Sequence, residues 1–276
     1  MNVSIHTRQL GLSSALISRL GVDVPGQELR NLLRDRHVDV VGLQTDATYP
    51  TGRVLGQEEA NHQMRYTIEG PSAWDYIAPD ETTLDLVAAS SFFVFGSLGS
   101  RRTTSASTLM NLLAVAPCPV LDINLRPPHY SAALLSVLLQ QAHWLKLNDD
   151  ELAELVRLGF TAGRTMEEQL LRLRTEYSLF VVCLTLGAAG ALLLTSEGYV
   201  RQAGFPVTVV DTVGSGDAFL AALLAGYCAS NSWPDALRSA CIMGAYVATQ
   251  SGAIPLVSNQ LLDEFSQTLP ENVLPV

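Results

Sequence analysis

The stretch D-T-V-G-S-G-D at residues 211–217 decides how the rest of this sequence is interpreted. The β-branched run 207–210 precedes it, and the small, apolar segment 218–225 follows it. This order predicts a strand, a glycine turn and a helix. Glycines permit a sharp turn, and the first N–H groups of a helix are unpaired and carry partial positive charge. The stretch therefore predicts a site for an anion such as phosphate.

Asp217 is unexpected at such a site, because its charge repels a phosphate. A carboxylate in this place has a purpose if it takes a proton from a hydroxyl that attacks phosphorus. The competing interpretation is that Ser215 or Asp217 only caps a buried helix. A glycine turn alone favours capping, whereas the rest of the sequence favours catalysis.

Length and composition narrow the class of protein. A chain of 276 residues can bury a large core, so we expect one domain with a small appendage. A net charge of -10 and a single lysine, Lys146, argue against a nucleic-acid partner. No apolar run approaches the ~18 residues that a membrane span needs, so we expect no membrane partner.

The four cysteines are far apart and include no C-x-x-C pair. We expect buried free thiols rather than two disulfides, and therefore a reducing, cytoplasmic location. The residues concerned are Cys118, Cys183, Cys228 and Cys241.

Apolar runs alternate with helical patterns along most of the chain. The expected strands are 38–43, 92–95, 120–123, 144–147, 179–184, 191–194 and 207–210. The expected helices are 5–20, 103–115, 131–140, 149–158, 165–174, the segment after Gly216, and 234–248. The alternation predicts an α/β fold with a mostly parallel sheet covered on both faces, and ligands at the carboxyl ends of its strands.

The segment 45–69 is more polar and is interrupted by Pro50, Gly52 and Gly56. Short alternating pieces within it predict a small sheet that projects from the main body. We therefore expect a core formed by residues 1–44 and 70–276, and a small β lid at 45–69.

Polar residues follow three of the expected strands. Asp122, Asn124 and Arg126 alternate, so in an extended chain they share one face, where Asn and Arg can hold hydroxyls or phosphate oxygens. The alternative is a solvated loop with an incidental ion pair.

The next strand ends at K-L-N-D-D-E, residues 146–151, which could equally be an ordinary capping box. The glycine turn 185–190 could be only a turn between strands.

Together these motifs resemble, in order and spacing, the ribokinase-like (pfkB) carbohydrate kinases, and fructokinase-type members in particular. The 211–217 stretch is the specific part, and the other motifs are moderate to weak. The resemblance implies a three-layer α/β/α fold with a β lid, and transfer of the γ-phosphoryl group of ATP to a hydroxymethyl group of a small sugar. Fructose is the favoured sugar, Mg²⁺ a cofactor and K⁺ a candidate one. A homodimer through the lid is also implied.

The resemblance also implies residue roles. Asp217 is the catalytic base, and Gly214, Ser215 and Gly216 form the anion hole. The sugar-binding residues are Asn2, Arg101, Asn124, Arg126 and Asp217. The nucleotide-binding residues are Lys146, Asn148, Thr185, Gly187, Gly190, Gly214, Gly216, Gly252 and Ala253. Glu151 places Mg²⁺ through water, and Asp211, Val213 and Gly252 offer oxygens to a monovalent cation.

One departure concerns the first residues. The family begins with a strand that carries a sugar-binding Asp, followed by a Gly-Gly turn, and here residue 1 falls about where that turn should end. We therefore expect an N-terminal truncation that lacks the first strand. The alternative function is a catalytically impaired homologue that only binds nucleotide or sugar, although Asp217 argues against it. A P-loop and an α/β-hydrolase elbow are excluded, because neither motif occurs.

Overall fold

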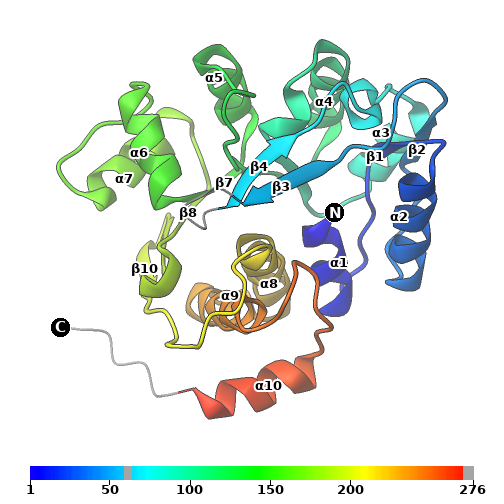
Figure 1. The fold of residues 1–276 in the computed structure, drawn as a ribbon. Helices are drawn as coiled ribbons and strands as arrows, with labels where there is room; N and C mark the ends of the chain where they lie inside the picture. Colours follow the sequence, from blue (N-terminus) through cyan, green and yellow to red (C-terminus); the bar gives the residue numbers. More distant parts are fainter. Residues whose placement is uncertain (59–63, 270–276) are drawn as a thin grey trace.

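The computed structural model describes residues 1–58 and 64–269, which form a three-layer α/β/α fold (Figure 1). The central sheet has six strands in the order β10-β9-β8-β7-β6-β5. Its strands are β5 (Phe93–Gly96), β6 (Pro119–Asp122), β7 (Trp144–Asn148), β8 (Val181–Thr185), β9 (Ala191–Thr195) and β10 (Gly198–Gln202). Strands β5 to β8 pair in parallel, whereas β9 and β10 are antiparallel additions at one edge. The predicted fold class is confirmed.

Helices cover both faces of this sheet. One face packs against α4 (Thr103–Val115), α5 (Ala132–Gln141), α6 (Asp149–Arg157) and α7 (Met166–Glu176). The other packs against α1 (Asn2–Gln9), α8 (Ser215–Ser230), α9 (Trp233–Ala248) and α10 (Asn259–Thr268). Alternate residues of one strand serve the two cores: Val182 and Leu184 face the first, whereas Val181 and Cys183 face the second. This period of two follows from the pleat of the strand.

The N-terminal region forms a second, two-stranded sheet and corrects two predictions. Strands β1 (Ser18–Gly21) and β2 (Leu43–Asp46) pair in parallel, and α2 (Val24–Asp35) connects them. The predicted helix over 5–20 is wrong, because α1 ends at Gln9 and Gly11 adopts a φ of 92°, a conformation that terminates helices. The strand predicted over 38–43 starts later, at Leu43. Neither α2 nor α3 (Glu81–Ala88), which precedes β5, was predicted.

The small sheet expected within 45–69 is present. Strand β3 (Val54–Glu58) pairs antiparallel with β4 (Met64–Ile68). In Figure 1 this ribbon crosses the front of the view, between the labels of α4 and α8. Residues 59–63, which belong to the predicted lid, lie outside the described part of the chain.

The segment that leads into the 211–217 turn is not a strand, contrary to prediction. The side chains of Val209 and Val210 are 57% and 63% exposed. The N–H groups of Val210 and Asp211 both donate to the carbonyl of Ala248, at the end of α9. The last carbonyls of a helix have no intrahelical donor, so α9 can hold this segment in place of a sheet neighbour.

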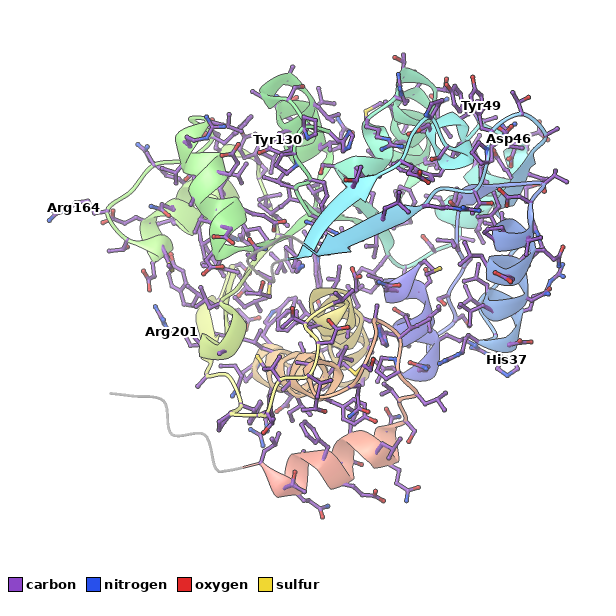
Figure 2. All side chains as sticks on the ribbon, viewed as in Figure 1. His37, Asp46, Tyr49, Tyr130, Arg164 and Arg201 are labelled. Atoms are coloured by element: carbon purple, nitrogen blue, oxygen red, sulfur yellow. The ribbon has the colours of Figure 1, made fainter. Side chains whose placement is uncertain are left out.

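Two predictions about composition can be compared with the structure. All four cysteines are free, as predicted, but Cys228 is exposed and Cys118 only half-buried, so the expected burial is wrong for these two. No helix in residues 1–58 and 64–269 combines the length and the apolar character that crossing a bilayer requires. Figure 2 shows how polar side chains such as those of His37, Arg164 and Arg201 project from the periphery.

Candidate active site

The predicted site residues come together at the carboxyl ends of the parallel strands. Gly96 at the end of β5, Asp122 at the end of β6 and Lys146 in β7 lie in register across the sheet. Asn148 at the end of β7 pairs with Thr185 at the end of β8. The edge of the sheet therefore presents four consecutive strand ends to one region.

Helix α8 supplies unpaired donors to this region. The N–H of Ser215 donates to the carbonyl of Thr212 at 3.2 Å, and that of Ala218 donates to the carbonyl of Gly214 at 2.9 Å. The N–H groups of Gly216 and Asp217 donate to no residue in the described part of the chain. Fewer amides than predicted are therefore free to bind an anion at this turn, because the Ser215 amide is already engaged.

The hydroxyl of Ser215 is a further unused group. Its Oγ is buried and has no hydrogen-bond partner among the described residues. Buried polar groups in native proteins nearly always have a partner, so an unpaired one is a feature that a ligand oxygen can satisfy. Two free amides and one free hydroxyl at the N-terminus of a 16-residue helix fit a phosphate group.

Gly214 is required by the geometry of the turn. Its φ is 82°, and a Cβ at this position would lie 2.5 Å from the carbonyl oxygen of Ala253. The loop around Ala253 is held in turn by the imidazole of His6, whose Nε2 lies 2.9 Å from the same oxygen. Burial lowers the pKa of His6, so this imidazole is neutral at pH 7.

Asp217 lies in the first turn of α8, next to the N-terminus of α1. Its Oδ2 accepts a hydrogen bond from Nδ2 of Asn2 at 2.9 Å, whereas its Oδ1 accepts none from the described residues. The carboxylate is thus oriented by Asn2 and keeps one oxygen for another partner. The predicted base and the predicted sugar contact Asn2 are direct neighbours.

Below the turn lies a buried ion pair. Nζ of Lys146 donates to Oδ1 of Asp122 at 3.0 Å, and a Cβ on Gly216 would lie 3.2 Å from the same Nζ. Burial raises the pKa of Asp122 to about 6, and the charges of Asp217 and Glu151 add to the rise while Lys146 opposes it. Burial lowers the pKa of Lys146, but Asp122, Glu151 and Asp217 outweigh this effect and the net pKa is raised.

The Asn148–Glu151 pair forms the capping box that the sequence offered as the alternative. Oδ1 of Asn148 accepts from the N–H of Glu151 at 2.8 Å, and Oε2 of Glu151 accepts from the N–H of Asn148 at 2.9 Å. Oε1 of Glu151 also accepts from the N–H of Leu125 at 2.9 Å. This buried carboxylate therefore fastens the loop after β6 to the start of α6, whether or not it also has a role toward a metal.

The predicted sugar-binding residues differ in how far their polar groups are already bonded to the protein. Asn124 has a φ of 42°, which interrupts the extended alternation that the sequence suggested. Arg126 is exposed, and its Nη1 donates to the neighbouring carbonyl of Leu125.

Arg101, another predicted sugar contact, is largely occupied by the protein itself. Its Nε and Nη2 donate to the two carboxylate oxygens of Asp75 at 2.6 and 2.8 Å, and Nη2 also donates to the carbonyl of Glu69. The guanidinium lies over the ring of Trp74 at 4.1 Å. Its evident role is to fix the chain that follows β4.

The predicted nucleotide turn directly follows β8, whereas the predicted cation residues meet at the 211–217 turn. Gly187 and Gly190 have φ values of 53° and 97° in the turn after β8. Asp211 accepts from the N–H of Val213 at 3.0 Å and from the N–H of Gly252 at 3.2 Å. The three residues proposed for a monovalent cation are therefore adjacent, although the Asp211 carboxylate is already used by two amides.

Sequence analysis assigned no role to Asp75 or His6, or to Asp122 as the partner of Lys146. Asp122 carried a weak signal, because it begins the alternation after β6. Asp75 and His6 carried none, since each acts through a partner distant in sequence. Within residues 1–58 and 64–269, no group of three or more His, Cys, Asp or Glu side chains is arranged to hold a metal ion.

A carboxylate beside unpaired helix amides, at the carboxyl edge of a parallel sheet, is typical of an enzyme that transfers phosphoryl groups. Comparison with known proteins agrees. The signature of the pfkB family of carbohydrate kinases matches residues 1–260, and the chain belongs to this family.

Individual relatives are moderately similar. A fructokinase from Solanum tuberosum is 27% identical over 271 residues, which cover 94% of this chain and 82% of that protein. Aminoimidazole riboside kinase from Salmonella typhimurium is 28% identical over 275 residues, which cover 92% of this chain and 82% of that protein. Among solved structures, Vibrio cholerae fructokinase with fructose, ADP and calcium ion bound gives a TM-score of 0.81 at 26% identity, covering 96% of this chain and 89% of that one. These relatives differ in acceptor, so family membership leaves the substrate open.

Proposed function

We propose that this protein transfers the γ-phosphoryl group of ATP to a hydroxymethyl group of a small sugar, with fructose as the first candidate. The observation that carries the proposal is the position of Asp217 beside the free N–H groups of Gly216 and Asp217 and the unpaired hydroxyl of Ser215. A base and an anion site in contact are what an attacking hydroxyl and a transferred phosphoryl group need.

Asp217 takes the proton of the attacking hydroxyl through the oxygen that Asn2 leaves free. The amides of Gly216 and Asp217 and the Ser215 hydroxyl bind the oxygens of the transferred group. Lys146, held by Asp122 under Gly216, provides a fixed positive charge close to the same oxygens. The exposed Arg126 is free to swing toward the phosphates.

Several further assignments belong to the same proposal. Asn148 and Glu151 would help to hold Mg²⁺, which would neutralise phosphate charge, and Asp211, Val213 and Gly252 would hold a monovalent cation. The turns at Thr185, Gly187 and Gly190 and at Gly252 and Ala253 contact the nucleotide.

The proposal also assigns a role to the lid and an oligomeric state to the protein. Residues 45–69 act as a lid on a core of residues 1–44 and 70–276 and exclude water, which would otherwise accept the phosphoryl group. The lid is also the proposed contact between two copies of the chain in a cytoplasmic homodimer.

The test is coupled ADP release with a panel of acceptors: fructose, ribose, aminoimidazole riboside and a nucleoside. We expect turnover with one acceptor, and for Asp217→Asn a kcat lower by at least ~10² with ATP affinity little changed. Asp235→Asn is the matched control, because Asp235 also lies in the first turn of a helix, α9, and outside the site. It should leave kcat unchanged.

Two results would contradict the proposal. Nucleotide binding without turnover of any acceptor would indicate a binder rather than a kinase. Full turnover by Asp217→Asn would refute the role of the base while leaving the family assignment intact.

A further inference from the structure

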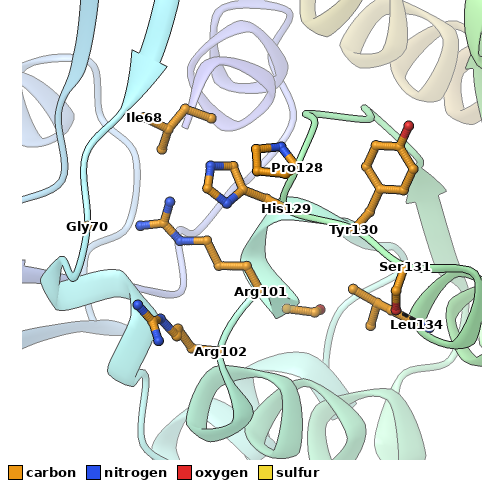
Figure 3. Close-up of a pocket in the computed structure, with 10 residues that line it drawn as sticks. Ile68, Gly70, Arg101, Arg102, Pro128, His129, Tyr130, Ser131 and Leu134 are labelled. Carbon is orange, nitrogen blue, oxygen red and sulfur yellow. Dashed lines mark hydrogen bonds between the residues drawn. The ribbon is translucent and has the colours of Figure 1, made fainter.

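A cavity of about 500 Å³ lies beside the residues proposed to contact the sugar (Figure 3). Its walls are Ile68 and Gly70 at the end of β4, the segment 100–102 before α4, and the segment 128–131 before α5. The first wall spans the end of the proposed lid, at Ile68, and the start of the core, at Gly70; the second contains Arg101, and the third begins two residues after Arg126. Two of these walls therefore contain or adjoin residues that the proposed function assigns to the acceptor.

The polar side chains of this cavity are mostly cationic or donors. Figure 3 shows the ends of the Arg101, Arg102 and His129 side chains gathered on the side of Gly70. The charge of Arg101 is balanced by Asp75, but Arg102 forms no ion pair with any residue in the described part of the chain. Among the described residues no carboxylate lines the cavity, and Glu154, which accepts from the hydroxyl of the lining residue Tyr130, is paired with Arg157.

Two helix N-termini add to this positive potential. Helix α4, of 13 residues, starts from Arg102 with no side-chain cap and no acidic residue in its first turn. Helix α5, of 10 residues, starts from Ser131, which together with Leu134 lines the cavity. The N-cap residues of both helices thus line the cavity, where a helix dipole favours negative charge, although the Ser131 hydroxyl already accepts from the N–H of Leu134 at 3.2 Å.

A separate observation concerns a buried hydroxyl in the wall of the cavity. Ser100 lines the cavity, its residue is only 6% exposed, and its Oγ has no hydrogen-bond partner among the described residues. A buried hydroxyl without a partner is uncommon in native proteins. Ser100 is therefore an unused hydrogen-bonding group on the wall of the cavity.

We infer that this cavity binds the anionic group, a carboxylate or a phosphate, of a small molecule, through Arg102, His129 and Ser100. The anion comes from one of two sources. It is the charged end of the acceptor, a sugar acid or sugar phosphate, in which case the inference rests on the proposed kinase function. Otherwise it is a separate anion that occupies the cavity beside a neutral acceptor.

The first experiment measures binding without turnover. Inorganic phosphate and gluconate are titrated into the protein at constant pH while the imidazole signals of His129 are followed by NMR, with the assignment made from His129→Gln. We expect a saturable shift, at least tenfold weaker binding in Arg102→Gln, and several-fold weaker binding in Ser100→Ala. Arg102→Lys keeps the charge and should retain most of the affinity, which separates loss of charge from loss of fold.

The control is Arg164→Gln, at an arginine that projects from a different side of the molecule from Tyr130 (Figure 2). It should bind both anions as the wild type does. A His129 signal that does not move with either anion, or a shift equal in wild type and Arg102→Gln, would overturn the inference.

The second experiment separates the two sources. If the acceptor carries the anion, Arg102→Gln should raise KM for a sugar acid or sugar phosphate at least tenfold while kcat is nearly unchanged, and phosphate should compete with that acceptor. If the anion is separate, phosphate should bind without competing with a neutral acceptor. Absence of turnover with every acceptor would reject the kinase function alone, because the NMR titration stands without it.

Discussion

Replacing Lys146 with Met removes the only positive charge from a buried ion pair. Lys146 and Asp122 are 8% and 6% exposed, and their Nζ–Oδ1 distance is 3.0 Å. In Lys146→Met the Asp122 carboxyl must either stay ionised without a partner or hold a proton in the folded state. Loss of one partner of a buried pair typically costs about 3–5 kcal/mol.

The ionisation of Asp122 sets how this loss depends on pH. The carboxyl of Asp has a pKa near 3.9 in the unfolded chain. Keeping it protonated in the folded variant at pH 8 therefore lowers the unfolding free energy by about 6 kcal/mol, and this is the largest loss that the variant can show. The folded pKa of Asp122 in the wild type is raised to about 6. Below that pH the carboxyl is neutral in both proteins, so the variant loses little. We expect about 3–5 kcal/mol of lost unfolding free energy at pH 8, and less than about 1 kcal/mol at pH 5.

The measurement is urea unfolding of both proteins at the two pH values. The double variant Lys146→Met/Asp122→Asn should recover most of the loss at pH 8, because neither charge remains. Arg157→Met is the matched control: the Arg157 side chain, which pairs with Glu154, is 68% exposed, so its loss should lower the unfolding free energy far less than Lys146→Met does at pH 8. Equal losses at pH 5 and pH 8 would refute the argument.

Three further substitutions test the site and its support. Ser215→Ala should raise KM for ATP by about tenfold and leave the unfolding free energy unchanged or slightly higher, since it removes an unpaired buried hydroxyl; an unchanged KM would contradict the phosphate contact. Gly214→Ala should cost about 2–4 kcal/mol in denaturant unfolding, more than Gly11→Ala, because both glycines have φ values near 90° but only Gly214 has a neighbour in the way. Arg101→Lys should lower the melting temperature by breaking the two-point contact with Asp75, and a changed KM for the sugar with an unchanged melting temperature would instead indicate direct substrate binding.

The sequence predicted most elements where local patterns are strong. Helix α4 matches its predicted range, 103–115, and α9 begins one residue before the prediction. The failures occur where tertiary contacts override the local signal. The run 207–210 has strand composition, but it pairs with no strand in the described part of the chain, and the carbonyl of Ala248 accepts from the N–H of Val210 at its end.

The site was predictable as a set of residues but not as a set of contacts. Chain order alone places Asp122, Asn148 and Thr185 at strand ends, because parallel strands end at one edge. The bond from Asn2 to Asp217 and that from Arg101 to Asp75 depend on segments distant in sequence. No local sequence pattern shows which N–H group of the 211–217 turn already has a hydrogen-bond acceptor. In the structure it is the N–H of Ser215, which donates to the carbonyl of Thr212.

The contacts around Asp217 have a consequence for how the protein gains its activity. Asn2 and Asp217 are 215 positions apart, and His6 meets the carbonyl of Ala253 across 247 positions. Contacts between such distant segments close large loops and tend to slow folding. In a refolding experiment, far-ultraviolet circular dichroism should therefore return before ADP release does, so catalysis reports the final assembly of the chain rather than the formation of its helices.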